Sequence, residues 1–199
     1  MKKVLLVITL ALLTASISYA QNKESLAKVR RINGVEAYIL CEPLRDYEVV
    51  VDAGSGLKAE SLLTGGVVNK TISDRVEQFI RRVTKENARV DAVIYSAGKR
   101  IVGVQFKDEG TEKTRGMATV SKVMGYPVFV MNEPVMDYNA LGTKAGGIKV
   151  KSLVTGGIMN NSIEEDVQQM VKKTQNRAAD GILFEGGRDA TAIQFRSKK

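Results

Sequence analysis

The 199-residue chain contains no histidine, and this absence excludes several classes of chemistry. Without an imidazole side chain there is neither Ser-His-Asp nor Cys-His catalysis, and no metal site can use a histidine ligand. A metal ion could then be held only by oxygen ligands, which requires carboxylates gathered in space. We therefore expect no catalytic residue, no cofactor and no dedicated metal site.

Cysteine is almost absent as well, because Cys41 is the only one. A single cysteine cannot form an internal disulfide, and in an oxidising compartment a lone thiol must be buried, modified or paired between chains. Cys41 lies in an apolar, strand-like run, so we expect it to be buried. One thiol without any histidine is also a poor basis for a zinc or copper site.

Long apolar runs are missing beyond the N-terminus, where none approaches the length of about 18 residues that a membrane helix needs. The chain begins with a short cationic head, Met1-Lys2-Lys3, continues with an apolar run over 4–13 and reaches the small residues of Ser18-Tyr19-Ala20. This order is typical of a signal peptide. We predict that residues 1–20 are cleaved before Gln21 and that the mature chain is a soluble periplasmic or secreted protein.

The charge is only mildly basic. The formal net charge is +8, and removal of Lys2 and Lys3 with the signal peptide leaves +6. Acidic residues are interspersed throughout, and no lysine or arginine run alternates with aromatic residues, so we do not expect nucleic-acid binding.

What the chain does contain is an internal duplication. A constant offset of about 91 residues brings the same residue types together again and again. The matching segments are 26–34 with 117–125, 42–47 with 133–138, 61–69 with 152–160 and, after a two-residue deletion, 91–95 with 180–184 and 105–107 with 194–196. The polar segment 108–116 between the copies reads as a linker. The predicted organisation is therefore a first repeat over 21–107 and a second over 117–199.

Each repeat has the pattern of an α+β unit with the order β-β-β-α-β-β. In the first copy the strands are predicted over 27–32, 35–41, 47–52, 92–95 and 101–106, with a tight turn at Asn33-Gly34 and a strand end at Pro43. We expect an antiparallel-rich sheet with one helix packed across it. The aromatic residues of these runs are expected in the core; they are Tyr38, Tyr95, Phe106, Phe129, Phe184 and Phe195.

The helix of each repeat has a clear start signal. Thr71-x-x-Asp74 and Ser162-x-x-Glu165 are capping-box patterns at matching positions. Apolar residues follow at helical spacing, which predicts one buried face for each helix; they are Ile72, Val76, Phe79, Ile80 and Val83, and Ile163, Val167, Met170 and Val171.

The first candidate site is a pair of glycine-containing loops before the two helices. Free backbone amides and the helix dipole could hold an anion there. The alternative, which we favour, is that the glycines only let the chain turn from strand to helix. The candidate residues are Thr64, Gly65, Gly66 and Asn69, and Thr155, Gly156, Gly157 and Asn160.

The second candidate site is a corner between two strands, with the pattern Glu-Pro-x-x-Asp-Tyr in both copies. Two carboxylates and a phenol could bind a hard cation or serve in acid-base chemistry. A structural corner, in which the aspartate accepts turn amides and the tyrosine ring packs, is the interpretation we favour. The residues are Glu42, Asp46 and Tyr47, and Glu133, Asp137 and Tyr138.

Two short segments carry a family resemblance. Asp91-Ala92-Val93-Ile94 and Asp180-Gly181-Ile182-Leu183 each follow a predicted helix and open a predicted hairpin. With the tyrosine-containing corner before the helix, this arrangement resembles the small YbjQ-like domains, a family described as heavy-metal-binding. The resemblance implies an α+β fold and a binding role, and it carries over no catalytic residue.

The sequence thus predicts an exported, non-enzymatic binding or interaction module built from two pseudo-symmetric domains, with an envelope protein or a small ligand as its partner. Two alternatives stay open. One is a small-ligand or ion binder that uses the Thr-Gly-Gly loops or the corners, and the other is an enzyme that relies on carboxylates and tyrosine. Catalysis usually concentrates polar groups in one copy, and we expect neither copy to have gained such a set.

Overall fold

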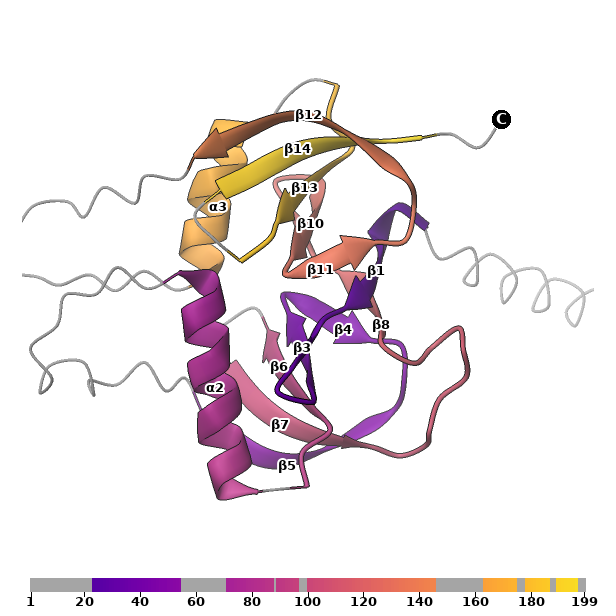
Figure 1. The fold of residues 1–199 in the computed structure, drawn as a ribbon, viewed down its shortest axis with the longest axis vertical. Helices are drawn as coiled ribbons and strands as arrows, with labels where there is room; N and C mark the ends of the chain where they lie inside the picture. The colour runs from indigo at the N-terminus through magenta and orange to yellow at the C-terminus, as the bar shows by residue number, and fades with distance from the viewer. Residues whose placement is uncertain are drawn as a thin grey trace, which may run out of the picture.

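The computed structural model describes residues 23–54, 71–87, 89–96, 100–145, 163–174, 178–186 and 189–196. Within these residues the fold is α+β, with two α-helices along one side of three β-sheets (Figure 1). Neither of the described helices has the length and apolar character needed to cross a membrane. The expected α+β class is confirmed.

The elements follow one another in a similar order in the two halves of the chain. A short 3-10 helix, η1 (Lys23–Ser25), comes first. The first half then contains β1 (Leu26–Val29), β2 (Arg31–Ile32), β3 (Val35–Ile39), β4 (Cys41–Pro43), β5 (Tyr47–Gly54), α2 (Ile72–Glu86), β6 (Ala92–Ser96) and β7 (Arg100–Phe106). The second half contains β8 (Met117–Val120), β9 (Lys122–Val123), β10 (Tyr126–Val130), β11 (Asn132–Pro134), β12 (Tyr138–Ala145), α3 (Ile163–Thr174), β13 (Gly181–Phe184) and β14 (Asp189–Phe195).

Each half builds a five-stranded sheet. The strand order is β2-β3-β6-β7-β5 in one and β9-β10-β13-β14-β12 in the other. The pairs β3–β6 and β10–β13 are parallel, because the helix between the two strands returns the chain to the same end of the sheet. The other described pairings are antiparallel, as the predicted antiparallel-rich sheet requires.

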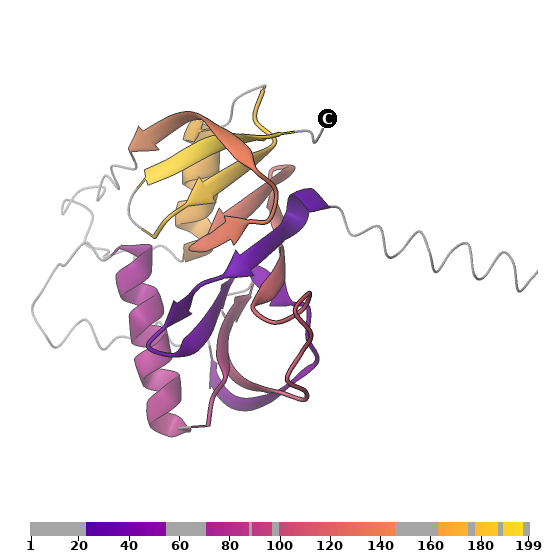
Figure 2. The same cartoon turned by 45° about the vertical axis from the view of Figure 1, so that its right-hand side comes forward.

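A third sheet combines strands from both halves in the order β11-β1-β8-β4 (Figure 2). At its centre Ala27 lies opposite Ala118. On either side the pairing is reciprocal, since Ala27 also lies opposite Pro134 while Ala118 lies opposite Pro43. We call this the shared sheet. Each half therefore contributes two strands to it, and neither half completes it alone.

The shared sheet exists because the predicted long strands are broken, so two predictions were wrong. The run 27–32 is divided at Arg30 into β1 and β2, and the run 35–41 is divided at Leu40 into β3 and β4. Leu40 has a φ of 53° and Met131 has a φ of 57°, a left-handed conformation that non-glycine residues rarely adopt. Backbone hydrogen bonds fix these kinks, from Leu40 N to Tyr95 O at 2.9 Å and from Met131 N to Phe184 O at 2.7 Å.

Two layers of apolar side chains fill the molecule. One layer packs the five-stranded sheets against α2 and α3, and it includes the whole predicted apolar face of each helix. The other lies between these sheets and the shared sheet, around Tyr38 and Phe129. Alternation along β3 explains the division, because Tyr38 belongs to the second layer and its neighbour Ile39 to the first.

The local signals at the helix and the hairpin are confirmed where the structure describes them. Thr71 Oγ1 accepts a hydrogen bond from Asp74 N at 3.1 Å, and Asp74 Oδ2 accepts one from Thr71 N at 2.8 Å. Asn33 and Gly34 have φ angles of 52° and 83°, as a tight hairpin turn requires. Ser162 lies outside the described residues.

Candidate functional site

The glycine-containing loops lie outside the residues that the structure describes. The candidates Thr64, Gly65, Gly66 and Asn69, and their counterparts Thr155, Gly156, Gly157 and Asn160, therefore remain predictions.

The two corners are built as structural turns with one polar contact on the surface. In the first corner the Tyr47 hydroxyl donates to Glu42 Oε2 at 3.3 Å. Partial burial raises the pKa of Tyr47, and the Glu42 carboxylate raises it further. The described contact of Asp46 uses its backbone carbonyl, which accepts from Lys107 N at 3.0 Å and ties the corner to the end of β7. Asp137 does the same with Arg196 N at 2.8 Å.

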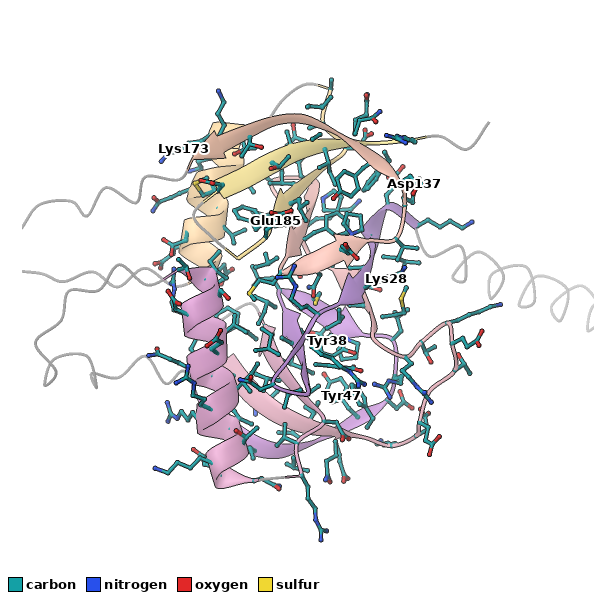
Figure 3. The ribbon with its side chains drawn as sticks, viewed as in Figure 1. Lys28, Tyr38, Tyr47, Asp137, Lys173 and Glu185 are labelled. Carbon is teal, nitrogen blue, oxygen red and sulfur yellow. The ribbon has the colours of Figure 1, made fainter. Side chains whose placement is uncertain are left out.

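The structure does not bring the two corners together. Glu42 lies on β4 and Glu133 on β11, which are the two edges of the shared sheet, with β1 and β8 between them. In Figure 3 Lys28 lies between Asp137 above and Tyr47 below. Among the described residues no group of three or more Asp, Glu or Cys side chains is placed to hold a metal ion. The four corner carboxylates therefore do not form one cation site.

The outer face of the shared sheet, by contrast, forms one continuous surface. Lys28 is exposed and lies directly opposite Glu133 on the neighbouring strand, and Glu42 is exposed opposite Thr119. Between these pairs lie the partly exposed side chains of Leu26 and Met117. The result is a small, partly exposed apolar centre flanked by charged and polar groups.

The cysteine on the inner face of the same sheet is buried and unreactive. Cys41 is 2% exposed, as expected from the strand pattern. Burial raises the pKa of its thiol to about 12. Since the thiolate is the reactive form of cysteine, this side chain is inert near neutral pH.

One buried polar cluster, around Glu36, was not predicted from the sequence. Glu36 is 2% exposed and accepts hydrogen bonds from Tyr38 Oη at 2.7 Å, Arg31 Nη2 at 2.9 Å and Arg45 Nη2 at 3.0 Å. The Arg45 guanidinium also lies 3.5 Å from the centre of the Phe106 ring. Burial raises the pKa of Glu36, but the hydrogen bonds from Arg31 and Tyr38 and the nearby positive charges outweigh it, so the pKa lies below its ordinary value.

This cluster belongs to one half of the chain. The positions that match Glu36, Tyr38 and Arg45 in the alignment of the halves hold Pro127, Phe129 and Met136. Only the first copy has gained this buried polar set, and its carboxylate is enclosed by hydrogen-bond donors. A search for differences between the copies would have found it, because a carboxylate in the apolar run of β3 needs a buried partner.

The cluster connects segments that lie far apart along the chain. Arg45 Nη1 donates to Glu109 O at 3.3 Å, and a Cβ added to Gly110 would lie 2.4 Å from Arg45 Cδ. Arg45 therefore joins β3 to the connecting segment 108–116. The carboxylate of Glu36 accepts from three donors and is 2% exposed, so it is enclosed by the protein rather than open to a substrate.

One described hollow could accommodate a small molecule. It has a volume of about 360 Å³ and lies between the β9–β10 hairpin and α3, within the usual range of ligand pockets. Leu40, Val123 and Met124 supply apolar walls, and Lys122, Gln168 and Lys172 supply polar ones. None of these residues was a candidate from the sequence, because they are far apart along the chain and no motif joins them.

The chain matches no family model, and comparison with curated proteins and with solved structures finds no similar protein. The resemblance to YbjQ-like domains therefore stays a prediction, and the functional argument depends on geometry alone.

Proposed function

We propose that the protein is an exported binding or interaction module, formed by an internal duplication whose two copies, 21–107 and 117–199, pair about a pseudo-twofold axis. The shared sheet carries this proposal, because its order β11-β1-β8-β4 is reciprocal between the halves. Contacts between residues at matching positions of the two halves support it as well. Cys41 and Asn132 touch each other, as do Arg75 and Asp166, and both pairs are 91 residues apart. Residues at equal positions in two copies meet each other only next to a twofold axis.

The outer face of the shared sheet is the binding surface that we propose. It lies over the axis, so both copies contribute to it equally, and it joins the two corners into one surface. Its exposed charges, Lys28, Glu42 and Glu133, suit a protein partner with a mixed polar and apolar surface rather than a nucleic acid. We expect this partner to be another envelope protein.

The reactive groups of the described residues favour binding over catalysis. The Cys41 thiol is buried with a raised pKa, and the Glu36 carboxylate is buried and accepts from Arg31, Tyr38 and Arg45. Neither side chain offers an accessible nucleophile or base.

Crosslinking from defined positions tests the proposed surface. A photoreactive amino acid is introduced at Lys28, on the outer face of the shared sheet, and in a second variant at Arg82, an exposed position on α2. We expect irradiation of intact cells to give a discrete crosslinked product from position 28 and none from position 82. Equal products from both positions, or none from either, would show that the shared sheet is not the binding surface.

The pocket at the β9–β10 hairpin favours a second candidate function, the binding of a small molecule. Its apolar walls suit a short alkyl chain, and its two lysines, Lys122 and Lys172, outnumber its one carboxylate, Glu164, which favours an anionic head group. Titration with octanoate should shift the NMR signal of the Met124 methyl group, and Lys172→Glu should weaken this shift. If the methyl signal does not move at millimolar octanoate, this candidate fails.

A further inference from the structure

The two helices meet at their N-terminal ends, next to the proposed axis. Ser73 N in the first turn of α2 donates to Gly186 O of the other half at 2.9 Å. Side chains from the first turns of the two helices also meet. Arg75 Nη2 donates to Asp166 Oδ2 in an ion pair. Arg75 is the fourth residue of α2, and Asp166 is the fourth residue of α3. The same helix position thus carries opposite charges in the two copies.

This ion pair is largely shielded from water. The Arg75 side chain is 13% exposed and that of Asp166 is 9% exposed. Shielding makes the sign of the charges matter more than it would on the open surface. The N-terminal end of a helix also carries a partial positive charge, and here two such ends lie close together. A carboxylate is favourable at this place, whereas two guanidinium groups would add to the positive charge of both helix ends.

The shared sheet alone would not prevent a half from pairing with a second copy of itself. If the first half paired with a second copy of itself, the central pair would still be two alanines, and Lys28 would lie opposite Glu42 instead of Glu133. In both arrangements an exposed lysine would face an exposed glutamate, because Glu42 and Glu133 hold matching positions in the two copies. Arg75, however, would meet another arginine. In a pair of second halves, Asp166 would meet another aspartate.

We propose that Arg75 and Asp166 make the two copies selective for each other, so that each copy binds the other and rejects a second copy of itself. This inference rests on the proposed duplication. The partner surface of each copy is the N-terminal end of its helix together with its two strands in the shared sheet. The ion pair supplies selectivity by penalising both like-charged combinations, which is how charged residues set partner choice in other paired helices.

The test uses the whole mature protein with a protease site inserted between Glu112 and Lys113, in the exposed part of the connecting segment. The folded protein is cleaved, unfolded in urea and refolded as an equimolar mixture of halves, and native mass spectrometry counts the mixed and the like pairs. We expect roughly a tenfold or greater excess of mixed pairs over the statistical share, because like charges across an interface are strongly unfavourable.

Two double variants carry the decisive comparison. Arg75→Asp with Asp166→Arg exchanges the charges and should keep the excess of mixed pairs. Arg75→Gln with Asp166→Asn removes the charges at similar side-chain size and should bring the mixture to the statistical share. An excess that survives in the neutral variant overturns the inference. Cleaved halves that separate entirely, even before unfolding, would instead contradict the proposed pairing of the copies.

The uncleaved protein gives a second readout if a cleaved variant fails to refold. Arg75→Asp alone places two carboxylates together and should lower the urea midpoint, as should Asp166→Arg alone. The charge-exchanged double variant should recover most of the loss. Additive effects of the two single substitutions, with no recovery, would also overturn the inference.

Discussion

Asn132 Nδ2 donates a hydrogen bond to Cys41 Sγ at 3.3 Å, and the two residues occupy the same position in the two halves of the chain. Both are buried, with exposures of 4% and 2%. Sulfur is a weak acceptor, so the contact adds little energy by itself. Its value is in the packing, because a small thiol and an amide together fill a buried space between the two halves.

The buried thiol should be unreactive in the native protein. With a pKa raised to about 12, only roughly one thiol in ten thousand is ionised at pH 8, and solvent does not reach the sulfur. We expect Cys41 to react with a colorimetric disulfide reagent only at the rate of unfolding, and to react within seconds in urea. Rapid, stoichiometric reaction of the folded protein would show that the shared sheet is open in solution.

Glu36 should make the protein acid-sensitive. Its folded-state pKa lies below the ordinary value of 4.5, so the cluster stabilises the fold fully above that value and loses its contribution as the pH falls through the lowered pKa. Glu36→Gln should cost about 3 to 5 kcal/mol at pH 7, because Arg45 is left buried without its counter-charge. The difference from the natural protein should shrink as the pH is lowered to 3. Urea denaturation at both pH values measures this, and a pH-independent difference would contradict the ion-pair role.

A double variant patterned on the second half provides the matched control. Glu36→Gln combined with Arg45→Met removes both charges and introduces the residue found at the matching position, Met136. It should be more stable than Glu36→Gln alone, because neither charge is left unpaired.

Short-range signals in the sequence predicted the local structure well. Thr71 and Asp74 formed the expected capping box, and Asn33-Gly34 formed the expected turn. Each signal depends on residues within one turn of chain, where the backbone geometry is set by neighbouring side chains. The apolar faces of both helices were predicted equally well, since burial follows the helical period.

Long-range features were not predictable in the same way. The kinks at Leu40 and Met131 have no glycine or asparagine to mark them, so the runs looked like single strands. Their geometry is fixed by hydrogen bonds to Tyr95 O and Phe184 O, which lie far along the chain, and no local pattern records such contacts. The Glu36 cluster likewise joins a strand, a corner and the connecting segment, and only the folded chain brings Arg45 to Glu36.

The cap of α2 should contribute measurably to stability. Thr71→Ala removes the oxygen that accepts from Asp74 N and should cost about 0.5 to 2 kcal/mol. Thr84→Ala is the control, because Thr84 Oγ1 donates only to backbone carbonyls of its own helix, Ile80 O and Arg81 O, and such bonds add little. We expect Ser162→Ala to resemble Thr71→Ala. Denaturation midpoints that do not change in either cap variant would mean that the helices begin elsewhere.

Export and processing can be checked directly. We expect the mature protein to begin at Gln21, because the small residues of Ser18-Tyr19-Ala20 suit signal peptidase. N-terminal sequencing of protein from the envelope fraction decides this. Recovery of a chain that still begins at Met1, or recovery from the integral membrane fraction, would be evidence against export as proposed.

Metal titration decides between two opposing expectations, one from the family resemblance and one from the composition. The resemblance implies a heavy metal, whereas the chain has no histidine and its one thiol is buried with a raised pKa. The corner carboxylates cannot replace these ligands, because Glu42 and Glu133 lie on opposite edges of the shared sheet. We therefore expect calorimetry of the mature protein to detect no zinc or copper site tighter than roughly micromolar, and only weak calcium or magnesium binding. The Cys41→Ser variant is titrated in parallel. A stoichiometric, submicromolar zinc or copper site that persists in this variant would have to be built from oxygen ligands outside the described residues, and it would restore the metal-binding interpretation.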